Sequence, residues 1–169
     1  MASHGRDNDQ GPFGGEAVGP NPTDRGKKGT KRHLLSDGRG VPLSLTVDGA
    51  NRHDMKMTEE TLSNVQAVPI DPQQEQNLSL DKGFDYPEVY DLLELYGYKA
   101  HIRSRGEEKK EIERIPGYRA RRWVVERTHS WMNRFRRLLV RWEKKKLHYL
   151  NMIYIACAYI ALRIAGVLG

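Results

Sequence analysis

Apolar residues along the 169-residue chain form two patterns, short runs next to turn residues and a spacing that repeats every three to four residues. Short apolar runs bounded by turns are typical of strands, and the repeat is typical of helices with one buried face. Gly and Pro clusters separate these segments and give the order hairpin, helix, strand, helix, strand, helix, helix, which indicates a mixed α/β layer architecture. The expected strands cover 31–36, 41–47, 78–81 and 98–102, and the expected helices cover 54–65, 86–96, 120–145 and 150–162.

Residues 1–30 show neither pattern and are rich in Gly, Pro, Asn and Asp. Such a composition favours loops over packed elements. The first residues also lack the apolar stretch of a secretory signal, so a cytoplasmic location is expected. We therefore expect an irregular lead-in over 1–30 and one domain over 31–169.

The C-terminal run 150–162 holds 13 residues without a charge and is closed by Arg163. Because a membrane-spanning helix needs about 20 apolar residues, a buried helix is favoured over a membrane anchor. Cys157 is the one cysteine of the sequence, which excludes a disulfide scaffold and a Cys-rich zinc module.

The positive charge is concentrated in one segment. The whole chain has a net charge of +6, but residues 119–146 contain eleven Lys and Arg against Glu126 and Glu143, so this segment carries +9 and the rest sums to −3. A local basic excess favours binding of a polyanion such as DNA, because neutralised phosphates release counterions. The alternative is a helix with an ordinary solvated face.

Two carboxylates have no evident local task. Asp81 follows a buried strand, at the kind of sheet edge where α/β proteins place ligand groups, and Glu126 is an acid among arginines. Carboxylate oxygens are suitable ligands for Mg²⁺ or Mn²⁺. Alternatively, Asp81 is a turn residue and Glu126 pairs with Arg122 one turn earlier, a contact worth about 0.2–0.5 kcal/mol.

His53 lacks a second His or Cys at ligand spacing, so a role in structuring its loop is expected.

Five stretches of the chain, in this order and from about residue 12 onward, resemble a bacterial insertion-sequence transposase of the DDE type. The similarity is to the insertion-sequence-five family within the broader insertion-sequence-four-like group. The stretches are Gly19-Pro20-Asn21-Pro22-Thr23-Asp24-Arg25-Gly26, Leu34-Leu35-Ser36-Asp37-Gly38-Arg39-Gly40-Val41-Pro42, Gly49-Ala50-Asn51-Arg52-His53-Asp54, Asp81-Lys82-Gly83-Phe84-Asp85 and Arg122-Trp123-Val124-Val125-Glu126-Arg127-Thr128-His129-Ser130-Trp131.

The resemblance implies a ribonuclease-H-like core in which three acids bind two divalent ions, Mg²⁺ or Mn²⁺. Asp81 matches the second acid and Glu126 the third, so both are expected to be catalytic metal ligands. Arg119 stands where the wider group often has Tyr, and Asn133 stands where Lys is usual. The residues expected to contact DNA are Arg119, Arg122, Arg127, His129, Asn133, Arg134 and Arg137.

The first acid of the triad has no counterpart at its expected place, which lies near Met1 or ahead of it. Asp7 and Asp9 are close, but no apolar strand precedes either residue. The resemblance therefore predicts a catalytic domain incomplete at its first strand and truncated on its N-terminal side, without the usual N-terminal DNA-binding region. We therefore expect the chain to be the downstream reading frame of a two-frame element or a decayed fragment.

The expected function is DNA transposition, by metal-dependent cleavage of element ends and strand transfer, with the chain incompetent alone. Its expected partners are double-stranded DNA of the ends and target, and an upstream-frame product or further copies of the chain. The expected location is the bacterial cytoplasm, at the nucleoid, without a membrane. The alternatives are a non-catalytic DNA-binding remnant that regulates intact transposase and a basic RNA-binding protein.

Overall fold

A computed structural model describes residues 2–10, 14–22, 24–67, 73–103, 110, 113–114 and 122–168, with 2–10, 103 and 122 described by their backbone. The strands are β1 Ala2–Gln10, β2 Gly19–Pro20, β3 Lys28–Ser36, β4 Pro42–Gly49, β5 Gln76–Asp81 and β6 Tyr98–Arg103. The helices are α1 Asp54–Ser63, the 3₁₀ turn η1 Lys82–Phe84, α2 Pro87–Leu95, α4 Arg122–Met132, α5 Arg136–Leu139 and α6 Lys146–Ile164.

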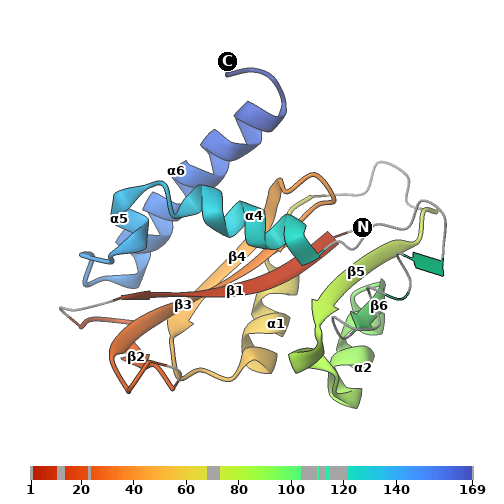
Figure 1. The fold of residues 1–169 in the computed structure, drawn as a ribbon, viewed down its shortest axis with the longest axis horizontal. Coiled ribbons are helices and arrows are strands. Elements are labelled where there is room, and N and C mark those ends of the chain that lie inside the picture. The colour runs from red at the N-terminus through yellow and green to blue at the C-terminus, as the bar shows by residue number, and fades with distance from the viewer. Residues whose placement is uncertain are drawn as a thin grey trace.

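Within the described residues, the six strands form one mixed sheet (Figure 1). β3 is antiparallel to β4 on one side and to β1 on the other, and β2 pairs with the first residues of β3. β5 is parallel to β1 and to β6. The expected hairpin and the two later strands are confirmed as β3, β4, β5 and β6.

β1 corrects the expectation of an irregular lead-in over residues 1–30. It runs through the middle of the sheet, with Ser3 to Gln10 paired to β3 and Ala2 and Ser3 paired to β5. Its sequence lacks the apolar alternation of a typical strand. The strand forms because neighbouring strands pair its backbone groups, so tertiary pairing overrides local propensity.

Each face of the sheet packs into its own hydrophobic core. Leu34 and Leu35, neighbours on β3, bury their side chains on opposite faces because successive residues of a strand alternate. α4, α5 and α6 cover the face of Leu34, here called the α4 face, and α1 and α2 cover the other. The α4-face core contains Leu34, Leu45, Val47, Val125, Met132, Leu138, Tyr149, Ile153, Ala156 and Ile160; the other contains Leu35, Leu62, Leu78, Leu80, Phe84, Val89 and Leu93.

The single helix expected over 120–145 is wrong beyond Met132. α4 ends there, a turn follows, and the short α5 precedes an extended segment that leads into α6. Met132 and Leu138 are both buried in the α4-face core. Six residues apart, they would lie about 120° from each other around a continuous helix, and the break brings both side chains into the same core.

α6 is apolar on both of its faces but buried on one. Tyr149, Ile153, Ala156 and Ile160 form the buried stripe, which confirms the expected packing of this helix for one face. Ile155 on the opposite face is 64% exposed. By length and composition alone the helix is also able to cross a membrane.

Candidate active site

Asp81 lies at the carboxyl end of β5, where the strand passes into η1. Leu78 and Leu80 of the same strand are buried in the core beneath α1 and α2. Because side chains alternate along a strand, Ser79 and Asp81 belong to the opposite face, which α4 covers. The side chain of Asp81 is half-buried there.

Glu126 lies in the second turn of α4, which packs over β1 and also contacts β3 and β5. Val124, Val125 and Thr128 are buried against the sheet, whereas Glu126 is exposed. In the described part of the chain, no side chain forms a hydrogen bond or ion pair with the Glu126 carboxylate. The structure thus brings Asp81 and Glu126 to the same face of the sheet.

β1 lies beside β5 in the sheet, and α4 packs over it. Its positions Asp7 and Asp9 are paired in register with Arg32 and Thr30 of β3. Among the described residues, no three His, Cys, Asp or Glu side chains form a cluster that could hold a metal ion. The available donors at the α4 face are carboxylate oxygens, which fit Mg²⁺ or Mn²⁺ better than softer metals.

Arg127, an expected DNA contact, is held by protein groups. Its guanidinium carbon lies 4.4 Å from the centroid of the Trp123 ring and 4.7 Å from that of Trp131. Its Nη2 donates to the backbone carbonyl of Arg39, 2.6 Å away. Sequence reasoning missed this contact, because the two residues lie 88 positions apart.

The other expected DNA contacts differ in accessibility. Arg134 and Arg137 are exposed, and Arg137 forms a 2.9 Å ion pair with Glu143. Asn133 accepts a 2.6 Å hydrogen bond from Arg32, and His129 is 6% exposed. Arg122 opens α4, but its side chain is not among those described, and Arg119 lies outside the described residues.

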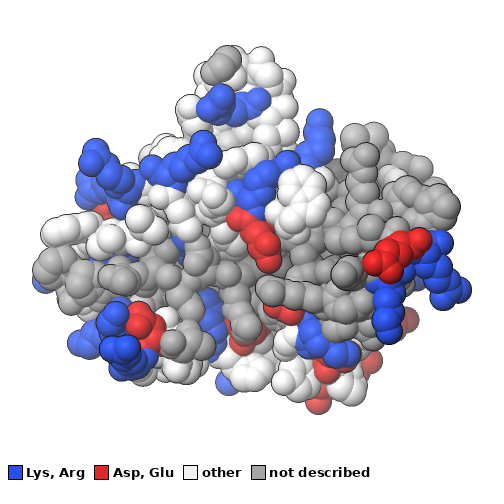
Figure 2. Space-filling view, viewed as in Figure 1, with Lys and Arg blue, Asp and Glu red and all other residues white. Residues whose placement is uncertain are grey.

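A basic surface remains over the C-terminal helices. Figure 2 shows Lys and Arg side chains gathered where α4, α5 and α6 lie in Figure 1, with few acidic side chains among them. Arg134 also lines a cavity of about 550 Å³ together with Arg163 and aromatic rings. Arg141, by contrast, is 2% exposed and donates to Thr30 and to backbone carbonyls, so it is a core residue rather than part of this surface. The exposed Lys and Arg residues of this surface are Arg134, Arg136, Arg137, Lys144, Lys145 and Arg163.

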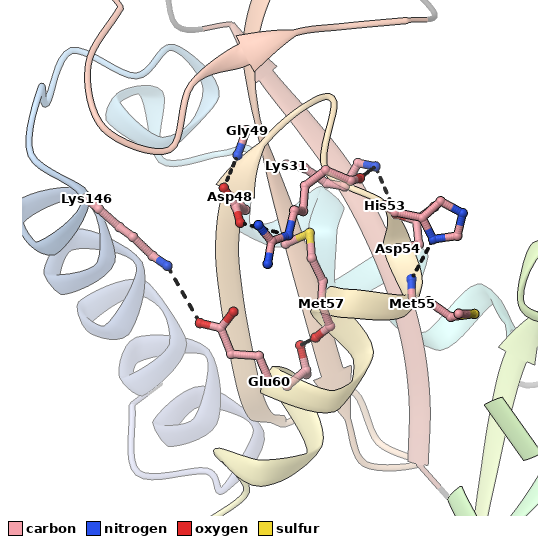
Figure 3. A network of polar contacts seen from close by, with 11 residues as sticks. Lys31, Asp48, Gly49, His53, Asp54, Met55, Met57, Glu60 and Lys146 are labelled. Atoms are coloured by element: carbon pink, nitrogen blue, oxygen red, sulfur yellow. Dashed lines mark hydrogen bonds and ion pairs between the residues drawn. The ribbon is translucent and has the colours of Figure 1, made fainter. Parts of the chain in front are cut away.

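The loop between β4 and α1 is structured by the residues expected to do so. Lys31 Nζ donates to Asp54 Oδ1 and to the Arg52 carbonyl, both at 2.9 Å (Figure 3). His53 caps α1 by accepting a 3.4 Å hydrogen bond from the Met55 amide. These contacts give the pair His53 and Asp54 a structural role.

Asp85, four residues after Asp81, also has a local role. Hydrogen bonds from Lys82 and from the Tyr90 hydroxyl stabilise its ionised form and lower the pKa of its carboxyl group. Burial, with the hydrogen bond to Asp85, raises the pKa of Tyr90. Asp85 therefore fastens η1 to α2.

The described part of the chain is a mixed α/β domain with two carboxylates on one face of its sheet and a basic surface over its C-terminal helices. The sequence profile of the family described as "Transposase DDE domain" matches residues 5–161, and the chain belongs to this family. The chain is 31% identical over 159 residues to a protein described as a transposase for insertion sequence element IS402 of Burkholderia cepacia, an alignment that covers 88% of this chain and 70% of that relative. The chain is thus a DDE transposase domain whose function is DNA transposition.

Proposed function

We propose that Asp81 and Glu126 together hold divalent metal ions, Mg²⁺ or Mn²⁺, for cleavage of element ends and strand transfer. The observation that carries this proposal is that β5 alternation and the packing of α4 assign both acids to one face of the sheet. Oxygen donors of this kind suit these ions.

A ribonuclease-H-like core is the fold we infer for this site. The support is the strand order β4, β3, β1, β5, β6, in which three antiparallel strands are followed by two parallel ones. In this order β1 is the central strand and lies directly beside β5, whose last residue is Asp81.

The chemistry of such a site is phosphoryl transfer. When bound, a pair of divalent ions lowers the charge repulsion of the phosphodiester and stabilises the attacking and leaving oxygens. Asp81 and Glu126 contribute the negative charge that retains the ions. Exposed Arg134 and Arg137 are placed to bind phosphates of the DNA backbone.

Asp7 is our candidate for the third acid. The expectation of an incomplete triad depended on the lack of a strand before Asp7, and β1 now contains this residue. Ser3 pairs with Ser79 in the parallel ladder with β5, so Asp7 follows on β1 beyond the level of Asp81. Its register partner Arg32 bonds Asn133, next to α4.

Nicking of supercoiled plasmid in Mg²⁺ or Mn²⁺ tests this function. We expect Asp81→Asn, Glu126→Gln and Asp7→Asn to abolish nicking, and Asp9→Asn to retain it as the matched control on the same strand. Nicking that persists in Asp81→Asn contradicts the proposed site. Nicking lost in Asp81→Asn but kept in Asp7→Asn contradicts the assignment of the third acid.

A second candidate is a DNA-binding transposase remnant without catalysis. It is favoured by the exposed Arg134, Arg136 and Arg137, which can bind DNA phosphates without the two acids. DNA affinity without nicking in the wild-type chain, unchanged in Glu126→Gln, supports this candidate. The exposed apolar face of α6 supports assembly with further copies of the chain or with an upstream-frame product. We propose the bacterial nucleoid as the location because DNA is the partner of a transposase.

A further inference from the structure

One flank of α4 is fastened to the turn between β3 and β4. Thr128 Oγ1 donates to the Gly40 carbonyl at 2.9 Å, and Arg127 Nη2 donates to the Arg39 carbonyl at 2.6 Å. A Cβ at Gly40 would lie 2.9 Å from Thr128 Oγ1 and 3.1 Å from Arg127 Nη2. The helix and the turn are therefore in close contact.

The guanidinium of Arg127 fits between two indole rings on this flank. Trp123, Arg127 and Trp131 are spaced four residues apart, which places them in one row along the helix. The faces of the two rings attract the cation, and the Arg39 carbonyl accepts a hydrogen bond from it. In the part of the chain with described side chains, no carboxylate forms an ion pair with Arg127. A cation enclosed in this way is suited to fixing the helix.

Glu126 projects from α4 in another direction. Successive helical residues differ by about 100° around the axis, so Glu126 lies about 100° from Arg127. In the sheet, the β3–β4 turn lies on one side of β1, and β5 lies on the other side. With the Arg127 flank turned toward β3 and β4, the flank that carries Glu126 is turned toward β5.

We propose that Arg127 is a positioning residue that fixes the rotation of α4 about its axis and so directs Glu126 toward Asp81. Trp123, Trp131 and the Arg39 carbonyl are the groups through which it acts. This inference rests on the proposed role of the two acids for its consequence, but the rotation of α4 is measurable by itself.

The test is a distance distribution between two nitroxide labels, measured by pulsed electron paramagnetic resonance. One label replaces Ser130, exposed on α4, and the other replaces Asp91, exposed on α2, in a Cys157→Ser background. We expect a narrow distribution in the parent chain and in Arg127→Lys, which keeps the cation. We expect a shifted or broadened one in Arg127→Ala and Arg127→Met. Arg136→Ala, an exposed arginine on α5, is the matched control and should resemble the parent.

Circular dichroism spectra and thermal unfolding of each variant separate rotation from loss of fold. If Arg127→Ala unfolds, Arg127→Met becomes the test variant. Its unbranched side chain still fills the space between the indoles but removes the positive charge. An unchanged distance distribution in folded Arg127→Met overturns the inference.

Mn²⁺ binding separates this inference from the proposed function. We expect the affinity for Mn²⁺ to fall about tenfold in Arg127→Met and to recover in Arg127→Lys. Tenfold is the smallest loss of metal affinity that is typical when a residue that orients a metal ligand is removed. A changed distance distribution with Mn²⁺ affinity unaffected even by Glu126→Gln contradicts the proposed metal site and leaves the rotational role of Arg127 intact.

Discussion

At the scale of single residues, glycines mark where distant segments meet. A Cβ at Gly19 would lie 1.8 Å from Asn51 Oδ1, so the segments around these two residues pack directly together. Gly40 makes the corresponding contact with α4 and has a φ of +89°, in the left-handed region that favours glycine. Gly19, Asn51 and Gly40, which belong to the stretches that carry the family resemblance, are thus contact points between segments.

Gly40→Ala should therefore destabilise the protein more than a glycine substitution in open space. Gly26 also has positive φ, +72°, but nothing lies within 4 Å of an added Cβ, so Gly26→Ala costs only backbone strain of about 1–2 kcal/mol. The crowding at Thr128 should add about 1 kcal/mol or more for Gly40→Ala. Urea unfolding measures both; equal decreases in unfolding free energy would contradict the close contact between turn and helix.

Cys157 should be a poorly reactive thiol. Burial raises its pKa from 9.0 to about 12, with Arg32 opposing the shift. At a pH below 9 the folded chain then holds about a thousandfold less thiolate than the unfolded chain, and thiolate is the reactive form. We expect iodoacetamide to alkylate the native chain far more slowly than the urea-unfolded chain at pH 8; similar rates would contradict the burial.

The raised pKa of Cys157 also makes the folded chain less stable at alkaline pH. Between pH 9 and about 12 the unfolded thiol loses a proton that the folded thiol keeps, so the unfolded state is favoured as pH rises through this range. Cys157→Ala should reduce this alkaline loss of stability, as thermal unfolding measured over a series of pH values would show.

At the scale of elements, apolar periodicity predicted the hairpin, β5, β6 and the helices next to them. It could not predict β1, whose polar sequence is held by pairing with β3 and β5. It also could not predict the break after Met132, which depends on where Leu138 is buried. Both failures have the same cause, because tertiary contacts decided the structure where the local pattern was weak or continuous.

The candidate site, too, could be predicted from the sequence only where it does not depend on tertiary contacts. Asp81 and Glu126 were identifiable because their neighbours in the sequence gave them no local task. The enclosure of Arg127 was not, because its partner carbonyl is 88 residues away and charge alone suggested a phosphate contact.

α6 offers a test of how its apolar residues divide between core and surface. Ile153 is fully buried and Ile155, in the same helix, is 64% exposed. Ile153→Ala should lower the unfolding free energy by about 2–5 kcal/mol because it leaves a cavity, whereas Ile155→Ala should change it by about 0.5 kcal/mol or less. Similar effects of both substitutions on thermal unfolding would contradict the orientation of α6.

At the scale of the whole molecule, the acids and the basic surface lie on one side of the sheet. α4 carries Glu126 and leads into the exposed cations of α5 and the segment after it. DNA bound over these helices would pass close to the acids. The alignment covers 70% of the relative from Burkholderia cepacia, so that relative also has residues outside the aligned region.

The salt dependence of DNA binding should report the exposed cations. Removal of one cation that binds a phosphate reduces the slope of log affinity against log salt by about 0.9. We expect this reduction in Arg134→Gln, and no change in Lys99→Gln, an exposed residue of β6 that pairs with Glu75. Fluorescence anisotropy with duplex DNA over a salt series measures the slopes. A slope in Arg134→Gln equal to that of the wild-type chain would place the DNA elsewhere on the molecule.

The central claim is that Asp81 and Glu126 share the same ions. Mn²⁺ titrations followed by electron paramagnetic resonance, on the wild-type chain, Asp81→Asn, Glu126→Gln and the double variant, test it most directly, with exposed Asp91→Asn as control. If the two acids share one site, each single substitution weakens Mn²⁺ binding about tenfold or more. The double variant then loses little affinity beyond the larger single effect, because the effects of substitutions at coupled residues do not add. Unweakened binding in either single variant, or losses of affinity that simply add, would contradict the account.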